Sequence, residues 1–203
     1  FPAFVASGQT CVAGSRILVH SQIYDTFVQR LAARADQIEL GDPMKDSTQM
    51  GPVISQAALE RCHRFIATAH SEGGRQVAGT QALEMPSEFA KGYYIRPTVF
   101  ADVRPDHQLF QEEVFGPIIS ITRFETDDQA IALANTGDFG LGVSIWSRDI
   151  ARAHRLSRHI RGGIIWLNDH HRNDPRSVWG GVKDSGFGKE NGWDALRGYL
   201  SKK

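Results

Sequence analysis

Short, almost wholly apolar segments alternate with amphipathic segments along this chain. Residues 117–122 are Pro-Ile-Ile-Ser-Ile-Thr, and residues 163–167 are Gly-Ile-Ile-Trp-Leu. A strand that is apolar on both sides must be covered on both faces of its sheet, as in parallel sheets with helices on either side. The alternation therefore predicts the α/β class, with a three-layer αβα domain and a mostly parallel sheet.

Capping and turn-forming residues divide the chain into elements. Ser21, Ser55 and Thr126 are N-cap residue types that directly precede amphipathic stretches, and Gly73-Gly74 is typical of a left-handed helix end. The pattern predicts helices that begin near residues 23, 55, 126 and 149, and strands at 16–20, 76–78, 93–100, 117–122, 141–146 and 163–167. The glycine-rich, polar stretch 168–188 is interpreted as an ordered functional loop.

The charge balance excludes two classes of partner. Lysine plus arginine and aspartate plus glutamate number 23 each, so the formal net charge is zero. Nucleic acids and anionic membranes favour a clustered basic excess, so neither is expected as a partner. No apolar run approaches the roughly 18 residues of a membrane-spanning helix. Two cysteines, Cys11 and Cys62, are too few for a disulfide scaffold, so free thiols and a cytoplasmic location are expected.

The segment around Cys11 is the most informative in the chain. Residues 7–16 are Ser-Gly-Gln-Thr-Cys-Val-Ala-Gly-Ser-Arg, so the cysteine lies between glycine-containing turns and just before a predicted strand. The glycines would let a substrate and backbone amides approach the sulfur closely. A nucleophile needs the thiolate, and an unperturbed thiol with a pKa of about 8.5 is mostly protonated at pH 7. Spacing alone leaves open a buried structural cysteine, which is the interpretation for Cys62.

Four motifs, in order along the chain, resemble those of the aldehyde dehydrogenase superfamily. Residues 8–16 resemble its Gly-Gln-x-Cys-x-Ala-x-Ser-Arg motif, and residues 109–117 resemble its Glu-Glu-x-Phe-Gly-Pro signature. Residues 41–52 resemble the family's loop after the helix. Residues 179–186 resemble its late Gly-Gly-x-Lys-x-Ser-Gly segment, with Val178-Trp179 in place of Pro-Phe. On these residues the chain is identified as the C-terminal catalytic-domain portion of a member.

The resemblance implies roles for three residues. Cys11 would be the catalytic nucleophile, Glu113 would bind the nicotinamide-side ribose of NAD or NADP, and Phe115 would lie near the nicotinamide ring. An ionised carboxylate has two acceptor oxygens and can hold two neighbouring ribose hydroxyls. Glu112 would be structural, because neighbouring side chains of an extended stretch point to opposite faces.

The implied reaction oxidises an aldehyde to a carboxylic acid. The Cys11 thiolate adds to the carbonyl carbon to give a thiohemiacetal, hydride passes to the nicotinamide, and an activated water hydrolyses the thioester. The Cys11 amide is the candidate oxyanion donor, and one such donor contributes about 3 kcal/mol; in the family an asparagine side chain supplies a second. The sequence leaves open which aldehyde is used, the choice between NAD and NADP, and whether water or CoA accepts the acyl group.

The family carries its dinucleotide-binding domain and a Glu-Leu-Gly-Gly general-base motif ahead of the nucleophile. This chain begins ten residues before Cys11. We therefore expect residues 1–203 to be a catalytic domain without the N-terminal dinucleotide-binding domain, and to be inactive alone. The stretches 137–142 and 180–188 are interpreted as turns, because neither contains G-x-G-x-x-G after a strand of a βαβ unit. The full-length protein is expected to be a homo-oligomer, as is usual in the family.

The loop at residues 168–174 contains adjacent histidines and two aspartates. Zinc sites usually use separated ligand pairs, so no metal site is predicted. By the resemblance, this loop approaches the substrate entrance, where His170, His171 and Trp179 would shape the aldehyde pocket.

Two other classes of function stay open at this point. A cysteine acyltransferase or hydrolase would use the same thiolate with a histidine base paired to Cys11. A non-catalytic assembly domain would keep the fold and bury Cys11.

Overall fold

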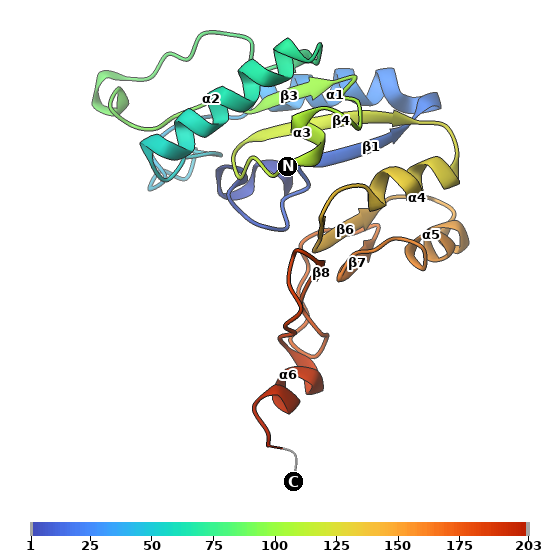
Figure 1. Cartoon of the computed structure of the whole chain (residues 1–203). Helices are drawn as coiled ribbons and strands as arrows, with labels where there is room; N and C mark the ends of the chain where they lie inside the picture. The colour runs from blue at the N-terminus through green and yellow to red at the C-terminus, as the bar shows by residue number, and fades with distance from the viewer. Residues whose placement is uncertain (1, 202–203) are drawn as a thin grey trace. The chain divides into compact units, whose positions relative to one another are not determined.

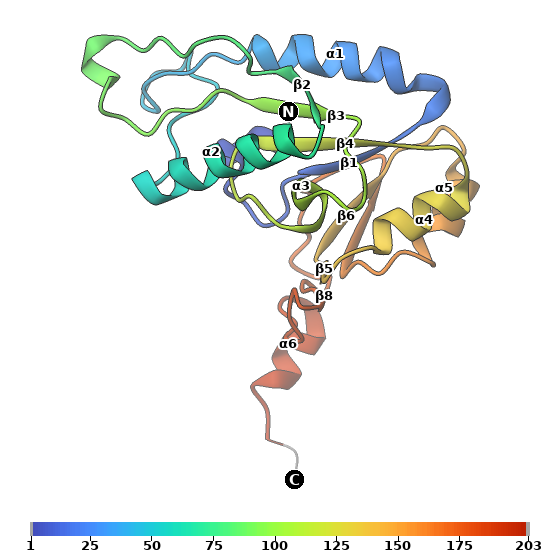
Figure 2. The ribbon, with the colours of Figure 1, turned by 45° about the horizontal axis from the view of Figure 1, so that its top comes forward.

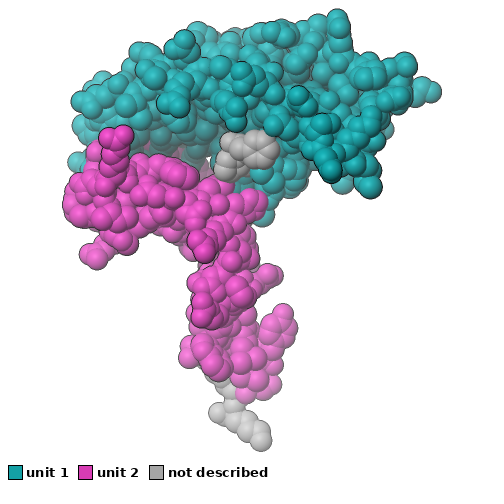
Figure 3. All heavy atoms as spheres, turned by 180° about the vertical axis from the view of Figure 1, so that it is seen from behind, with its two compact units in different colours: residues 1–130 teal, residues 131–203 magenta. Residues whose placement is uncertain are grey.

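The computed structural model describes residues 2–201 of the chain. These residues form two compact units, 1–130 and 131–203 (Figure 3). The architecture is mixed α/β with a mostly parallel sheet, which confirms the predicted class. The sequence suggested one layered domain, whereas the structure has two units. The assignment of all 203 residues to one catalytic domain stays a prediction.

Unit 1 is built on a four-stranded sheet with the strand order β1-β4-β3-β2 (Figure 2). The strands β1 (Arg16–His20) and β3 (Thr98–Ala101) both pair in parallel with the central strand β4 (Ile118–Phe124). The edge strand β2 (Arg75–Ala78) pairs antiparallel with β3. Three parallel strands with one antiparallel edge strand are a common form of α/β sheet.

Helices cover both faces of this sheet (Figures 1 and 2). The helix α1 (Tyr24–Asp36) lies on one face, and α2 (Gln56–Ser71) with the short α3 (Gln108–Gln111) lies on the other. Unit 1 is therefore the three-layer αβα sandwich that the sequence predicts. The core on the α1 face is built from these buried side chains, among others: Val19, Tyr24, Val28, Ala35, Val99, Ala101, Ile119 and Ile121.

Alternate residues of the same strands fill the other face. Phe100 and Ile118 are fully buried there, and the His70 ring of α2 packs edge-on to Phe100 with the ring centroids 5.2 Å apart. The central strands are thus apolar on both sides because both sides are covered. The strand expected at residues 93–100 is shorter than predicted and begins at Thr98, because Pro97 cannot donate to a strand ladder.

Two of the predicted helix caps are present. The Ser55 hydroxyl accepts a hydrogen bond from the Ala58 amide at 3.2 Å, and the Thr126 hydroxyl accepts one from the Gln129 amide at 3.2 Å. Gly73 follows α2 with φ +86°, the left-handed conformation that ends a helix.

The predicted cap at Ser21 is wrong. Residues Ser21–Ile23 form the 3₁₀ helix η2, and the His20 ring accepts the Gln22 amide at 3.2 Å in place of a serine cap. A second 3₁₀ helix, η3 (Ser87–Phe89), lies in the long connection between β2 and β3, and η1 (Pro2–Gly8) opens unit 1.

Unit 2 has short strand pairs in place of a wide sheet. The strands β6 (Gly142–Ile145) and β7 (Ile164–Leu167) pair in parallel, and α5 (Ile150–Ser157) lies between them in the sequence. The strand β5 (Phe139–Gly140) pairs antiparallel with β8 (Val182–Lys183). The helix α6 was not predicted. Within residues 2–201 no helix has the length and apolar content to cross a membrane. The elements are α4 (Asp127–Asn135), which contains the division between the units, β5 (Phe139–Gly140), β6 (Gly142–Ile145), α5 (Ile150–Ser157), β7 (Ile164–Leu167), β8 (Val182–Lys183) and α6 (Gly192–Gly198).

Hydrogen bonds of the buried Tyr24 hydroxyl hold α1 against the sheet. Tyr24 is fully buried, and its hydroxyl donates to the Asp102 carboxylate at 3.0 Å while accepting the Asp102 amide at 2.7 Å. Asp102 also pairs with Arg75 of β2 at 2.8 Å, and the Arg123 guanidinium lies 4.0 Å from the Tyr24 ring centroid. Burial raises the pKa of Tyr24 to about 12.

Replacing Tyr24 with phenylalanine should destabilise unit 1. The substitution leaves the Asp102 amide without its acceptor and one Asp102 carboxylate oxygen without the Tyr24 donor, while the other oxygen keeps Arg75; such a loss costs about 1–3 kcal/mol. Urea denaturation monitored by circular dichroism would measure the change in the free energy of unfolding. Tyr93→Phe is the matched control, because Tyr93 is 37% exposed. Equal stability of the two variants would contradict the role given to the Tyr24 hydroxyl.

The same hydroxyl should make stability fall at alkaline pH. The unfolded chain loses the Tyr24 proton near pH 10, whereas the folded chain keeps it until about pH 12. Between these values the unfolded state binds fewer protons, so the free energy of unfolding decreases as the pH rises. In Tyr24→Phe this part of the decrease should be missing when both proteins are unfolded with urea at pH 9, 10 and 11.

Candidate active site

Cys11 lies in a tight turn just before β1. The turn is closed by a hydrogen bond from the Ala13 amide to the Thr10 carbonyl at 2.9 Å, and the Cys11 side chain is exposed. The Cys11 amide donates to no acceptor within residues 2–201. The sulfur therefore lies on an exposed residue, and the Cys11 amide is not used in a hydrogen bond with the described chain.

The turn is anchored by two residues that precede it. The Ser7 side chain is buried, and its hydroxyl lies 2.9 Å from the Gly51 carbonyl oxygen and 3.2 Å from that of Pro52. Gln9 accepts the Ile54 amide at 3.0 Å. The loop at residues 41–52 and the residues just after it thus support the segment that carries Cys11.

Gly8 brings the Cys11 segment against the Glu-Glu-x-Phe-Gly-Pro segment. Its φ is +71°, and a Cβ placed on it would lie 2.2 Å from the carbonyl oxygen of Gly116 and 2.8 Å from the nitrogen of Pro117. These distances are far below a van der Waals contact, so only glycine fits. The two segments that carry Cys11 and Glu113 therefore meet backbone to backbone.

The sheet register explains why they meet. β1 and β4 are parallel neighbours, with Arg16 opposite Ser120. Cys11 and Phe115 each lie five positions before these paired residues, so both segments enter the sheet at the same edge. The two sequence-predicted segments are thus brought together within unit 1.

The Glu113 carboxylate is available to bind a ligand. Its side chain is exposed, and it makes neither a hydrogen bond nor an ion pair with residues 2–201. The preceding Glu112 has extended backbone, with φ −110° and ψ 152°, and its carboxylate accepts the Gln108 side chain at 3.0 Å. Glu112 is thus bonded within the described chain and Glu113 is not; the ligand-binding role of Glu113 stays a prediction.

Phe115 has an unusual backbone beside this carboxylate. Its φ of +54° lies in the left-handed region, which costs a non-glycine residue about 1 kcal/mol or more. The side chain is 37% exposed. The turn thus presents an aromatic ring to solvent in the segment that meets the Cys11 segment.

Comparison with known proteins decides the family. The sequence profile of the aldehyde dehydrogenase family matches residues 1–203. The chain belongs to the aldehyde dehydrogenase family.

Individual relatives are similar over the whole chain. A betaine aldehyde dehydrogenase of Cereibacter sphaeroides is 44% identical over 200 residues, which cover 98% of this chain and 40% of that protein. The peroxisomal aminoaldehyde dehydrogenase 1 of Pisum sativum is 38% identical over 203 residues, which cover 100% of this chain and 40% of the relative. The chain thus spans about 40% of the length of the curated relatives that it matches.

Solved structures agree with the fold. The crystal structure of betaine aldehyde dehydrogenase from Staphylococcus aureus in complex with NAD⁺ superimposes with a TM-score of 0.93 at 37% identity, covering 97% of this chain and 39% of the other. The apo G234S mutant of the same enzyme gives a TM-score of 0.95 over 100% of this chain and 40% of the other.

In this family member, Cys62 is a structural residue. It is fully buried on α2, and burial raises the pKa of its thiol to about 11. Its sulfur would lie 2.4 Å from a Cβ placed on Gly116, so the thiol packs directly on the peptide that Gly8 contacts. The interpretation of Cys62 as a structural residue is confirmed.

The late Gly-Gly-x-Lys-x-Ser-Gly motif of unit 2 makes hydrogen bonds to the end of α4 and to β5. The Lys183 ammonium donates to the carbonyl oxygens of Asn135 at 2.6 Å and Gly137 at 2.9 Å, which caps the end of α4. The Ser185 hydroxyl accepts the Gly140 amide at 2.9 Å. These contacts, like those of Ser7, were missed by sequence reasoning, because a motif does not reveal which carbonyl its polar residues reach.

The loop that follows β7 is held by its own side chains. Asn168 accepts the Ser147 amide at 2.8 Å and donates to the Ser147 carbonyl at 2.9 Å, and Ser144 lies 2.5 Å from the His170 ring. The rings of Trp166 and Trp179 are 6.4 Å apart between centroids. In the described part of the chain, no group of three or more His, Cys, Asp or Glu side chains could hold a metal ion.

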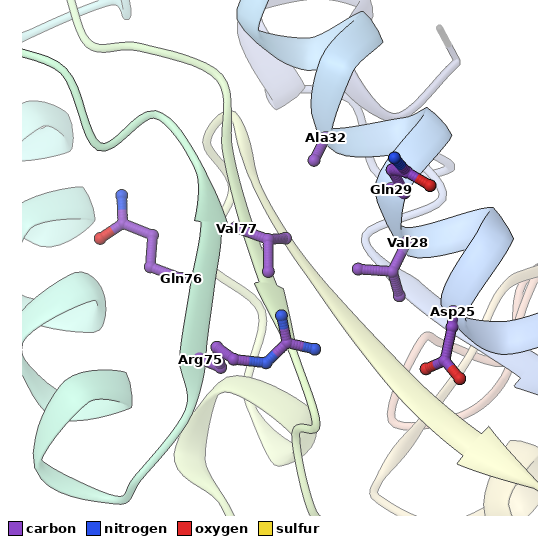
Figure 4. A pocket seen from close by; sticks show the side chains of 7 residues that line it. All are labelled: Asp25, Val28, Gln29, Ala32, Arg75, Gln76 and Val77. Carbon is purple, nitrogen blue, oxygen red and sulfur yellow. The ribbon is translucent and has the colours of Figure 1, made fainter.

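A groove of about 570 Å³ lies between α1 and the edge strand β2 (Figure 4). β3 and β4 separate β2 from β1, so this groove lies at the other edge of the sheet from the strand that Cys11 precedes. Its acidic and basic side chains are already paired, Asp25 with Arg123 at 2.9 Å and Arg75 with Asp102 at 2.8 Å. The lining residues are Asp25, Val28, Gln29, Ala32, Arg75, Gln76 and Val77.

The two cysteines should differ sharply in reactivity. Iodoacetamide at pH 8 should alkylate the exposed Cys11 at least about 100-fold faster than Cys62, whose raised pKa and burial both suppress the thiolate. Peptide mass spectrometry would assign the adducts, with Cys11→Ser as the control that takes up no label while folded. Comparable labelling of Cys62 in the folded protein would contradict this assignment.

Gly8→Ala should separate the two site segments. The new methyl group would overlap the Gly116 peptide and strain a positive φ, so we expect a loss of about 2–4 kcal/mol in unfolding free energy. Gly73→Ala is the control, because that position also has a positive φ but nothing lies within 4 Å of the added Cβ. It should cost only about 1 kcal/mol. The contact would be refuted by equal losses in denaturant titrations.

Proposed function

We propose that this chain forms the nucleophile-bearing part of an enzyme that oxidises aldehydes to carboxylic acids with NAD⁺ or NADP⁺. Cys11 is the catalytic nucleophile, and Glu113 with Phe115 contacts the cofactor. The observation that carries the proposal is the backbone contact of Gly8 with Gly116, which joins an exposed thiol segment to a segment with an unpaired carboxylate.

The Cys11 turn suits attack on a carbonyl carbon. The thiolate adds to the aldehyde to form a thiohemiacetal, and negative charge develops on the former carbonyl oxygen. The Cys11 amide, which has no acceptor within residues 2–201, can donate to that oxygen. After hydride transfer the acyl group remains on Cys11 as a thioester, which water hydrolyses to release the acid and restore the thiol.

The residues present fit a nicotinamide cofactor. The Glu113 oxygens have no partner in the described chain, so both can accept hydrogen bonds from the two hydroxyls of a ribose. The exposed Phe115 ring can pack against a flat heterocycle. When bound, the cofactor supplies the hydride acceptor. Crystal structures of the Staphylococcus aureus relative contain NAD⁺, which favours NAD⁺ over NADP⁺ for this chain.

The observations that would favour the other function classes are not met. No imidazole is bonded to Cys11 within residues 2–201, so the histidine base of a cysteine acyltransferase or hydrolase has no counterpart there. Cys11 is exposed in the described chain; in a non-catalytic assembly domain the Cys11 of the full-length protein would resist iodoacetamide. Homo-oligomer formation and a cytoplasmic location stay predictions from the sequence.

Substitution of the two site residues tests the proposal in the complete enzyme. Cys11→Ser should lower NADH formation from betaine aldehyde or an aminoaldehyde, read at 340 nm, by about 10³-fold or more while NAD⁺ still binds. Glu113→Ala should instead weaken NAD⁺ binding, measured by calorimetry. Residues 1–203 alone should form no NADH.

The matched control is Cys62→Ser, which should keep the wild-type rate per folded molecule because the Cys62 thiol is buried away from solvent. A Cys11→Ser enzyme with more than about a tenth of the wild-type rate would refute the nucleophile assignment.

A further inference from the structure

Glu113 follows the helix α3, which is too short to be stable without contacts from other parts of the chain. The helix α3 has four residues, Gln108–Gln111, and ends at Glu112, directly before Glu113. A single helical turn is not stable in isolation, because nucleation fixes many dihedral angles for few hydrogen bonds. The position of Glu113 therefore depends on what holds α3 from outside.

At its first residue, α3 is held by a carboxylate from α2. Both oxygens of Glu72 accept the Gln108 amide, at 3.0 and 3.1 Å. Glu72 is the C-cap residue of α2 and is itself fixed, because its own amide donates to the Thr68 carbonyl at 2.9 Å. A charged acceptor at a helix start is favourable as a charge-assisted hydrogen bond.

Near its last residue, α3 is held by a cation from β1. The Arg16 guanidinium donates to the Phe110 carbonyl at 3.5 Å and lies 4.6 Å from the centroid of the Phe110 ring. Arg16 opens β1, five positions after Cys11. The helix is thus contacted by Arg16 near its end and by Glu72 at its start, and its Leu109 and Phe110 side chains are buried.

A displacement of Gln108 would also displace Glu112, the residue directly before Glu113. The Glu112 amide donates to the Gln108 carbonyl at 2.9 Å, and the Gln108 side chain donates to the Glu112 carboxylate at 3.0 Å. Gln108 and Glu112 therefore move together.

We propose that Glu72 is a positioning residue for cofactor binding, which sets the location of the Glu113 carboxylate through α3. The inference rests on the proposed function of Glu113. It implies that Glu72 affects the affinity for the nicotinamide cofactor and leaves the chemistry of the Cys11 thiol unchanged.

Glu72→Gln tests this in the complete enzyme, because it keeps the size of the side chain and removes its charge. We expect the Kd for NAD⁺, measured by calorimetry, to rise about fivefold, part of the value of a charged hydrogen bond. The rate of Cys11 alkylation by iodoacetamide should change less than about 1.5-fold. The matched control is Glu88→Gln, an exposed glutamate outside these contacts, which should change neither quantity.

A double-mutant cycle with Glu113→Ala separates positioning from general destabilisation. If Glu72 acts through Glu113, Glu72→Gln should add less than about 1.5-fold to the Kd of a Glu113→Ala enzyme. The same fivefold loss in both backgrounds, or no loss in the wild-type background, would overturn the role of Glu72. Glu113→Ala without any effect on Kd would instead overturn the proposed role of Glu113, and the inference with it.

Folding is checked by thermal melts of each variant. If Glu72→Gln does not fold, Glu72→Asp serves in the same cycle, because it keeps the charge but withdraws the carboxylate by one methylene from the Gln108 amide. The outcomes that support or overturn the proposal are those given for Glu72→Gln.

Discussion

The parallel pairing of β1 with β4 is the interaction on which the candidate site depends. Cys11 and Glu113 are 102 positions apart in the sequence (113 − 11), yet each lies a few residues before one of two neighbouring parallel strands. Because parallel neighbours start at the same edge of a sheet, their ladder of hydrogen bonds brings both entry segments together. The contact between Gly8 and Gly116 then fixes how closely they approach.

The position of these segments is unusual for a sheet of this kind. Ligands of open α/β sheets generally bind beyond the carboxyl ends of the strands. Here the exposed thiol and the unpaired carboxylate both precede their strands, so they lie at the amino ends of β1 and β4. Fold class by itself would have predicted a site at the carboxyl ends of the strands, whereas the motifs predict one at the amino ends.

Local chemistry made part of the structure predictable. Ser55 and Thr126 cap their helices as expected, since a hydroxyl reaches an amide three residues ahead whatever the tertiary fold. The strand order, α3 and the Tyr24–Asp102 bonds were not predicted, because each depends on contacts between residues distant in sequence. For the site, the motifs predicted which segments matter, and only the structure showed the supports at Ser7 and Glu72.

The buried thiol of Cys62 has a consequence for the loop that carries Cys11. Gly116 lies between the Cys62 sulfur and Gly8, so a single peptide separates α2 from the loop that carries Cys11. Gly8 and Gly116 have no side chains that could change rotamer to absorb a displacement. Any increase in bulk at position 62 would therefore press on the Gly116 peptide, and through that peptide on Gly8, which precedes Cys11 by three residues.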